Sequence, residues 1–200
     1  MRRRSSEGVS IWHILTPVGR PARIDRARVL SEALALADER DLDAVTMAAL
    51  AQRLDVTTMA LYRHVASKAD LLDGLVEVLL AEAVQPSPDL PWPERLAAFA
   101  NDLRATARRH PSVFALLLQR PAATVEAREA RDAVRLALAD AGIPQQRTDQ
   151  MQRLLSTAVL GFAHSEVAGR FDALSARQRD ADFELLLELL TESIQSRLRD

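Results

Sequence analysis

Five polar side chains gather in one short stretch of the sequence, between residues 57 and 64. They supply hydroxyls, a guanidinium and an imidazole, and they are Thr57, Thr58, Tyr62, Arg63 and His64. Each of these groups can hydrogen-bond to a phosphate or to the edge of a DNA base. Met59 can contact a thymine methyl group, and Lys68 follows at the start of a predicted helix, where a cation and backbone N–H groups can hold a phosphate. This chemistry suits recognition of a nucleic acid.

Two short predicted helices position these side chains. The first spans 47–54 with Thr46 as its N-cap, and the second begins after Thr57 and continues to His64. A tight break at 55–56 separates them. The apolar residues that would hold the two helices at a fixed angle are Leu50, Ala51, Leu54, Val56 and Leu61. A helix-turn-helix of this kind can place its second helix in the major groove, although the bare pattern also occurs in proteins that bind no DNA.

Periodic apolar residues predict one helix on each side of this pair. The helix before it starts near Ile24 and ends at the polar stretch 38–43, and its apolar stripe is Val29, Ala33, Leu34 and Ala37. The helix after it opens at Ser67–Asp70, which looks like a capping box. That helix stops before a cluster of prolines, Pro86, Pro88, Pro91 and Pro93. The cluster is the clearest boundary in the chain.

The remaining chain also carries helical patterns to its end. The predicted helices are 93–109, 113–118, 124–142, 146–170 and 182–198, with a further turn of helix at 175–179. We find no strand pattern of useful length and no internal repeat. The sequence therefore predicts an all-α fold with roughly nine or ten helices.

Residues 23–80 resemble the N-terminal domain of the TetR family of transcriptional regulators. The matching residues are Ala33, Leu34, Thr46, Met47, Leu50, Ala51, Leu54, Val56, Leu61, Tyr62, His64, Val65, Lys68, Leu71 and Leu72. The resemblance implies that Tyr62 and Lys68 bind the DNA backbone. The predicted DNA-contacting set is Thr46, Met47, Thr57, Thr58, Met59, Tyr62, Arg63, His64 and Lys68. Asp55 stands where the family mostly has glycine, but aspartate tolerates the left-handed conformation well enough for the turn to survive.

The rest of the chain is similar to the body of the same family, and most closely to the tetracycline-repressor class. The matching pieces are Trp92, Arg120–Pro121 and Leu160–Gly161. Leu116 stands where that repressor has a metal-binding histidine, so we expect neither a magnesium–tetracycline ligand nor any other metal or cofactor. The expected effector is a large, mostly apolar molecule with a few polar contacts. The predicted pocket residues are Leu79, Phe99, Asn101, Leu103, Phe114, Leu117, Gln119, Met151, Leu155, Phe162 and His164, for which ordinary core packing is the alternative.

Two helices of this body have more apolar surface than one domain can cover. The last helix is apolar at Phe183, Leu185, Leu186, Leu187, Leu189, Leu190 and Ile194, and the helix before it is apolar nearly all round between residues 154 and 163. Pairing both helices with those of a second copy would bury the surplus in a four-helix arrangement. We therefore predict a homodimer.

Charge and composition support this organisation. The first 68 residues hold eleven Lys and Arg against eight Asp and Glu, whereas the rest of the chain is acidic. We expect a flexible basic arm at 1–20, a helix-turn-helix domain at 21–68, and a ligand-binding and dimerisation domain at 69–200. The chain has no cysteine and no apolar run long enough to span a bilayer, and we expect a cytoplasmic location without membrane contact.

The predicted function is that of a ligand-responsive regulator, a repressor that binds a palindromic operator as a dimer. Two alternatives stay open: an activator of the same fold, and a helical module that binds another protein. Enzyme function is not expected, because the four histidines, His13, His64, His110 and His164, form neither a metal-binding pair nor part of a nucleophile motif.

Overall fold

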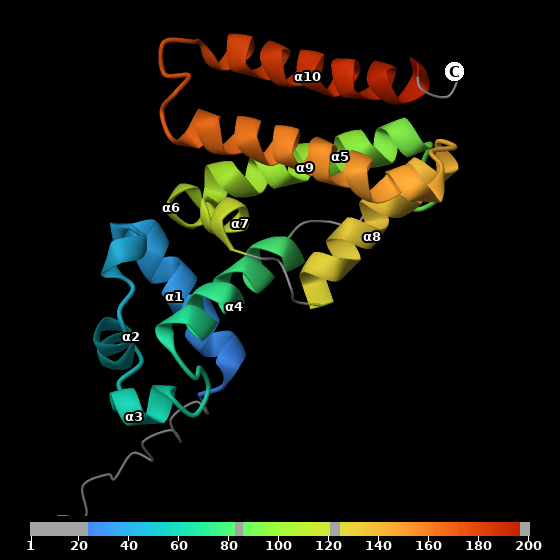
Figure 1. The fold of residues 1–200 in the computed structure, drawn as a ribbon. Coiled ribbons are helices and arrows are strands. Elements are labelled where there is room, and N and C mark those ends of the chain that lie inside the picture. Colours follow the sequence, from blue (N-terminus) through green and yellow to red (C-terminus); the bar gives the residue numbers. More distant parts are fainter. Residues whose placement is uncertain (1–23, 83–85, 121–124, 197–200) are drawn as a thin grey trace, which may run out of the picture.

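The computed structural model describes residues 24–82, 86–120 and 125–196, and all the regular secondary structure in these ranges is helical. Ten α-helices and one 3₁₀ helix are present there, without a strand, which confirms the predicted all-α fold class. Figure 1 shows α1–α4 at one end of the molecule and α5–α10 at the other, with α10 on the outside of the body. We call residues 24–82 the head and residues 86–196 the body. The predicted arm at 1–20 lies outside the described residues.

The first helix of the head, α1 (Arg26–Arg40), begins where the Asp25 carboxylate accepts a hydrogen bond from the Arg28 N–H at 2.8 Å. Its buried face contains the predicted stripe of Val29, Ala33, Leu34 and Ala37. The helix continues through residues 38–40, which we had predicted as its polar end. It stops at Asp41 because this residue has a φ of 102° and its carboxylate caps the 3₁₀ helix η1 (Leu42–Ala44).

The predicted helix-turn-helix is formed by α2 (Met47–Arg53) and α3 (Thr58–Leu61). Each helix begins at a threonine: Thr46 Oγ1 accepts from Ala49 N–H at 3.1 Å, and Thr57 Oγ1 accepts from Ala60 N–H at 3.2 Å. After Leu61 the chain continues as hydrogen-bonded turns to His64, so α3 is shorter than the sequence pattern predicts.

The turn between α2 and α3 depends on Asp55, which has a φ of 54°. This left-handed conformation is strained in most side-chain-bearing residues and free of strain in glycine. We therefore expect Asp55→Gly to be more stable than Asp55→Ala by about 1 kcal/mol in the free energy of unfolding. The glycine variant should accordingly unfold at a higher temperature. Thermal unfolding followed by circular dichroism measures this. Equal midpoints for the two variants would contradict the strain at residue 55.

The fourth helix, α4 (Lys68–Ala81), packs closely on α1. Ser67 Oγ caps it by accepting from Asp70 N–H at 3.1 Å. The Asp70 carboxylate accepts from Ala66 N–H at 2.7 Å, rather than from the N–H of the capping serine as in a capping box. Gly74 faces α1, and a Cβ atom there would lie 2.5 Å from Leu30 Cδ2. The absence of a side chain at this position lets the two helices approach each other.

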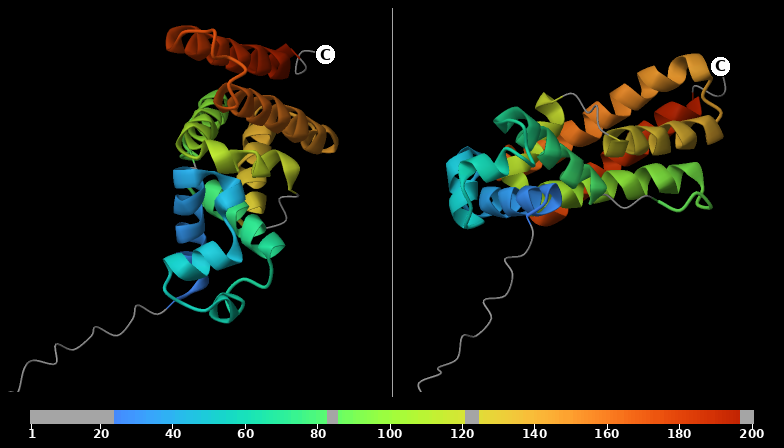
Figure 2. Two further views of the ribbon diagram at one scale, coloured as in Figure 1. Left: turned by 90° about the vertical axis from the view of Figure 1, so that its left-hand side faces the viewer. Right: turned by 90° about the horizontal axis from the view of Figure 1, so that it is seen from below.

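The body consists of α5 (Trp92–Arg109), α6 (Pro111–Phe114), α7 (Leu116–Gln119), α8 (Val125–Asp140), α9 (Gln145–Val167) and α10 (Ala176–Ser196). Two expectations about them are corrected. The single helix predicted at 113–118 is two short helices, and the turn at 175–179 and the last helix are one continuous helix, α10. Figure 2 shows the long helices of the body running roughly along the molecule, away from the head.

The head and the body each have a hydrophobic cluster of their own. The head cluster includes residues of α1, α2 and α4, and Val113 and Leu116 of the body pack into it. The main body cluster joins α5, α8, α9 and α10 through residues such as Phe99, Leu138 and Phe183. The head is therefore packed against α6 and α7 rather than linked to the body by the chain alone. Among the described helices none is long and apolar enough to cross a membrane.

Candidate nucleic-acid interface and ligand pocket

The surface around α3 carries the predicted DNA-contacting side chains. Met59 and Tyr62 are 71% and 49% exposed, although both are large and apolar enough to be buried in an ordinary core. The exposed members of the predicted set are Thr46, Thr57, Thr58, Met59, Tyr62, Arg63 and Lys68, whereas Met47 and His64 are partly buried. All nine come from the start of α2, from α3 with its following turn, and from the start of α4. We define this surface as the recognition surface.

Two ion-paired arginines fix the recognition surface to the rest of the head. Arg53 donates to Glu39 from two nitrogens at 2.7 Å each and to Glu32 at 2.8 Å, which ties α2 to α1. The hydrogen bonds that Arg53 donates to Glu39 and Glu32 raise the pKa of its guanidinium. Arg26 pairs with Asp70 at 3.0 Å, and it also donates to the carbonyl oxygen of His64 at 3.3 Å. The turn after α3 is thereby held against α1 and α4.

Lys68 has a second role that the sequence did not indicate. Its ammonium group donates to the carbonyl oxygen of Val45, directly before the cap of α2. Burial lowers the pKa of Lys68, and the charge of Asp43 acts in the opposite direction. An ammonium group has further N–H donors, so the contact with Val45 orients Lys68 without using up its capacity to bind a phosphate.

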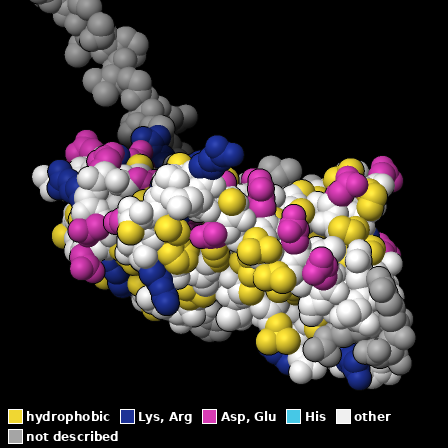
Figure 3. All heavy atoms as spheres, turned by 90° about the horizontal axis from the view of Figure 1, so that it is seen from above, with side chains coloured by type: hydrophobic (Ala, Val, Ile, Leu, Met, Phe, Trp, Pro, Cys, Tyr) yellow, Lys and Arg dark blue, Asp and Glu magenta, His cyan; other side chains and the backbone are white. Residues whose placement is uncertain are grey.

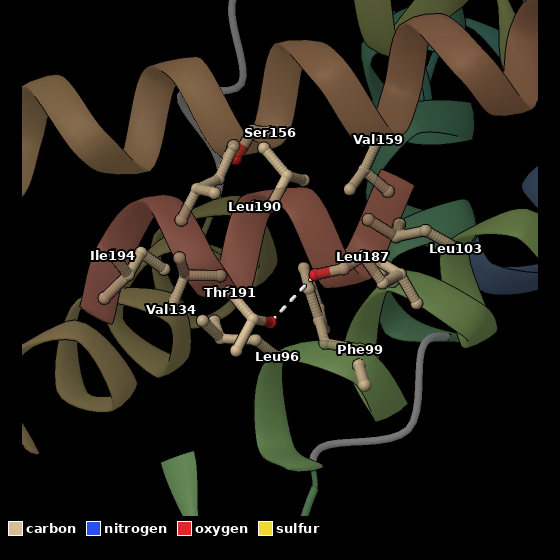
Figure 4. A pocket seen from close by; sticks show the side chains of 13 residues that line it. Leu96, Phe99, Leu103, Val134, Ser156, Val159, Leu187, Leu190, Thr191 and Ile194 are labelled. Carbon is tan, nitrogen blue, oxygen red and sulfur yellow. Dashed lines mark hydrogen bonds between the residues drawn. The ribbon is translucent and has the colours of Figure 1, made fainter. Parts of the chain in front are cut away.

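The body contains an apolar pocket between four helices. It opens to solvent, and Figure 4 shows side chains of α5, α8, α9 and α10 converging on it. Its lining residues are Leu96, Ala97, Phe99, Ala100, Leu103, Val134, Leu155, Ser156, Val159, Leu187, Leu190, Thr191 and Ile194. We call it the main pocket. The apolar lining and the opening to solvent suit the apolar part of a small organic molecule.

A second cavity of about 150 Å³ lies on the head side of the main pocket and shares Phe99, Leu103, Val134 and Ser156 with it. Its further lining residues include Leu80 of α4 and Leu117 of α7. The amide of Gln152, a buried side chain, also lines this cavity and donates to Ser156 Oγ at 2.9 Å. A molecule that extended into the second cavity would touch α4.

Four of the predicted pocket residues lie in these walls: Phe99, Leu103 and Leu155 in the main pocket, and Leu117 in the second cavity. The others do not line either cavity. Asn101 and Gln119 are exposed, and Asn101 bonds to the carbonyl of Ala97, because the inward face of α5 passes through residues 96, 99, 100 and 103. Leu79 belongs to the head cluster and Met151 to the main body cluster, Phe114 is buried in a small cluster with Ala107 and Ala163, and His164 is partly buried.

Phe162 is also placed elsewhere. Its ring packs against Phe171 and Phe183, with ring centroids 5.1 and 5.2 Å apart. The prediction missed lining residues from all four helices of the main pocket, and every α10 residue of its wall was missed: Leu187, Leu190, Thr191 and Ile194. Their spacing of three and four was the available signal, but the many leucines of this helix carry the same spacing on its other faces.

Polar contacts join the pocket helices to the head. His110, at the end of α5, places Nδ1 2.8 Å from Asp38 of α1 and Nε2 3.0 Å from Glu82 at the end of α4. Arg120, which follows α7, donates to the Asp73 carboxylate of α4 at 2.6 Å and to the carbonyl of Ala69 at 3.1 Å. Displacement of α5 or α7 would therefore disturb the hydrogen bonds that these residues make to α4.

The described residues show no arrangement of three or more His, Cys, Asp or Glu side chains that would hold a metal ion. The chemistry of the molecule, as far as these ranges go, consists of an exposed polar surface on the head and an apolar pocket in the body.

Two segments of the chain match known families. Residues 29–75 match the family described as "Bacterial regulatory proteins, tetR family", and residues 96–190 match the one described as "Tetracyclin repressor-like, C-terminal domain". An HTH-type transcriptional regulator of Saccharopolyspora erythraea is 31% identical over 169 residues, which cover 80% of this chain and 72% of that protein. The HTH-type transcriptional repressor DrrR1 of Streptomyces coeruleorubidus is 27% identical over 78% of this chain, which spans 58% of its length.

Solved structures share the fold. The Streptomyces coelicolor protein ActR in complex with actinorhodin superimposes with a TM-score of 0.77 at 23% identity, covering 88% of this chain and 98% of that one. Mycobacterium smegmatis BioQ gives a TM-score of 0.76 at 26% identity, covering 86% and 99%. BioQ has also been solved with its double-stranded DNA operator, and that structure gives a TM-score of 0.73.

Proposed function

The chain belongs to the TetR family of bacterial regulatory proteins, and on this premise we propose that it is a cytoplasmic repressor that binds a palindromic operator as a homodimer and releases it when a small effector binds. The observation that carries the proposal is the exposure of Met59 and Tyr62 on a head whose helices are fixed by ion pairs. Exposed large side chains on a rigid support are typical of a binding surface. The head binds DNA, the body binds the effector, and no residue has a catalytic role.

On DNA, the recognition surface divides its contacts. Thr57, Thr58, Met59 and Arg63 face the base edges in the major groove. Tyr62 and Lys68 bind phosphates and fix the orientation of α3. Thr46, Met47 and His64 lie at the margin of this surface. BioQ with its operator is the structural neighbour that supports binding to double-stranded DNA.

The dimer forms through the outer faces of α9 and α10. Leu185 and Leu189 are one turn apart on α10 and are 53% and 55% exposed, and Leu154 of α9 is also exposed. Figure 3 shows hydrophobic side chains interspersed with acidic ones on the face seen from above, the side on which Figure 1 places α10. A second copy related by a two-fold axis would bury these leucines and place two recognition surfaces on half-sites roughly 34–36 Å apart.

Release follows from the connection between the pocket and α4. An effector in the two cavities contacts Leu117 of α7 and Leu80 of α4, and Arg120 bonds α7 to α4. A tilt of α4 alters the spacing of the two heads. A coupling free energy of about 1–3 kcal/mol between effector and operator is enough to change affinity roughly 5- to 150-fold.

Selection of bound duplexes from a random pool, followed by salt titration of the best sequence, tests the proposal. We expect an inverted repeat, and an affinity that falls steeply with salt because phosphate contacts release counterions. A purified protein without salt-sensitive affinity for any duplex would refute DNA binding and would favour a protein-interaction module. A reporter gene placed behind the selected operator distinguishes repression from activation.

Arg63→Ala and Tyr62→Phe are expected to separate base reading from phosphate binding. Loss of the Arg63 guanidinium removes discrimination of about 1–3 kcal/mol at the base pair that it reads, while affinity for random duplexes changes little. Tyr62→Phe removes only a hydroxyl and weakens binding to operator and random duplex alike. Fluorescence anisotropy with the operator and with a random duplex measures the ratio of variant to parent affinity on each DNA. Equal losses on all DNA for Arg63→Ala would contradict its role as a base reader.

Val159→Trp is expected to fill the main pocket. Val159 is buried in its wall, so the larger ring would occupy the space of the effector. The neutral probe N-phenyl-1-naphthylamine, which fluoresces in apolar surroundings, should bind about ten-fold more weakly or not at all, while operator affinity stays within about two-fold of the parent protein. Ala98→Trp on the exposed side of α5 is the control and should bind the probe normally. Unchanged probe binding by Val159→Trp would show that the main pocket is not the ligand site.

A further inference from the structure

Arg95 is a buried cation whose hydrogen bonds are incomplete. The residue lies in the first turns of α5, and only 8% of its surface is exposed. Among the described residues, its one ion pair joins Nη2 to the carboxylate of Asp140, the last residue of α8. The Nε group is buried and has no hydrogen-bond partner within the described part of the molecule. A guanidinium with several N–H donors is thus served by a single carboxylate.

This arrangement is unfavourable without a further partner. Removing a cation from water is costly unless its donors are satisfied, and an unpaired buried N–H adds to that cost. The Asp140 side chain is 60% exposed, so water screens its attraction for Arg95. The stability of the fold therefore does not explain why Arg95 is buried beside a carboxylate that attracts it only weakly.

The position of Arg95 points to what completes it. Arg95 lines a cavity of about 160 Å³ together with Leu96, Phe99 and Val134, and these same three residues line the main pocket. Figure 4 shows Leu96 and Val134 side by side in the main pocket, with Phe99 of α5 in the same wall. The guanidinium therefore lies beside apolar walls that are continuous with the proposed effector site.

We propose that Arg95 binds an anionic group of the effector, and that the effector is an organic acid with an apolar body. The inference rests on the proposed function, because it assigns a ligand class to the same pocket. The carboxylate lies against Arg95, and the apolar part extends along Leu96, Phe99 and Val134. A carboxylate fits better than a neutral oxygen, because its two oxygens match the fork of the guanidinium and the bonds are assisted by charge.

Two probes of equal chain length test the assignment, decanoate and 1-decanol, each competing with N-phenyl-1-naphthylamine on the full-length protein. We expect Arg95→Met to weaken decanoate about ten-fold or more, which is the effect of losing a charge-assisted hydrogen bond, and to leave 1-decanol unchanged. Equal competition by decanoate against Arg95→Met and the parent protein would overturn the proposal.

Asp140→Asn is the matched control, because it removes the ion pair and keeps the guanidinium. Decanoate should bind this variant at least as tightly as the parent, since one competing carboxylate is gone. A loss of decanoate binding as large as that of Arg95→Met would overturn the proposal, because the ion pair would then act by holding α5 to α8. If Arg95→Met fails to fold by circular dichroism, Arg95→Lys replaces it, with an expected loss of decanoate affinity and none of 1-decanol.

The two proposals fail in different ways. Competition by 1-decanol, with a decanoate affinity that is independent of Arg95, refutes the acid and leaves an apolar effector site. Absence of probe binding and of competition by either compound refutes the effector site and the acid together. Operator binding is measured separately and does not depend on either result.

Discussion

Replacing both Leu185 and Leu189 with arginine is expected to yield a monomer that binds its operator roughly a hundred- to ten-thousand-fold more weakly. The two side chains lie one turn apart on α10 and are more than half exposed in the single chain. In a two-fold dimer the substitution would bring four cations into an apolar interface without partners, which a dimer cannot tolerate. The large loss of affinity follows because a monomer engages one half-site, whereas a dimer binds the second half-site at a high effective concentration.

Light scattering after size exclusion gives the mass, and anisotropy with an operator and with a half-site gives the affinities. The control is Leu136→Arg on α8, where an equally exposed leucine lies off the proposed interface. That variant should remain dimeric. A Leu185→Arg/Leu189→Arg protein that is still dimeric would contradict the placement of the interface, and a monomer with full operator affinity would contradict the need for a dimer.

Arg104→Met is expected to lower the free energy of unfolding by about 3 kcal/mol or more. Arg104 and Glu166 have side chains that are only 7% and 6% exposed, and they share two hydrogen bonds of 2.7 and 2.9 Å. Arg104 also donates to the carbonyl oxygen of Arg179 at 3.0 Å, and its guanidinium lies 4.6 Å from the ring centre of Phe183. Methionine is close in size, but it leaves the buried Glu166 carboxylate with the half-exposed Arg108 at 2.7 Å and with Arg179 at 3.5 Å.

The effect of Arg104→Met should depend on pH in a defined direction. Burial acts to raise the pKa of Glu166, but hydrogen bonds and charge from Arg104 and Arg108 outweigh it and leave the pKa below its unfolded value near 4.5. A carboxylate of this kind stabilises the fold fully above its unfolded pKa, and the contribution is lost as the pH falls through the lower folded pKa. The difference between parent and variant should therefore be largest near neutral pH and shrink below about pH 4.5.

Urea unfolding at several pH values measures this difference. Arg104→Met/Glu166→Leu removes both charges and should recover part of the loss, because no buried carboxylate is left without its two-bond partner. A variant with Arg104→Met that unfolds like the parent at neutral pH would show that the pair contributes nothing to stability.

Local patterns were enough to predict most of the head. The two threonine caps, the left-handed turn at Asp55 and the stripe of α1 each depend on neighbours within a few residues, and the structure contains all three. The pocket depends on contacts that a pattern cannot specify. Leu185 and Leu187 are both leucines of one helix, yet one points outward and the other into the main pocket, because the packing of α10 on α5 and α9 sets its rotation.

Long-range polar contacts were beyond the reach of the sequence pattern for the same reason. Arg104 and Glu166 are 62 positions apart, and His110 and Asp38 are 72 positions apart. The structure places Asn101 and Gln119 on the exposed surface and in neither cavity wall, since a polar residue in an apolar stretch is more often on the solvent side than in a cavity. Arg95, the buried cation beside the cavity described above, was not predicted as a pocket residue because arginine is seldom buried.

The close approach of α1 to α4 at Gly74 has a consequence for which helices of the head move together. The Leu30 side chain lies directly against the α4 backbone at Gly74, so a side chain at residue 74 would push α1 and α4 apart. We therefore expect α1 and α4 to move as one unit with α2 and α3, so that a small rotation of α4 at its body end displaces Tyr62 over a larger arc. The pivot of such a rotation is expected beyond Gly74, toward Leu80 and the cavity that it borders.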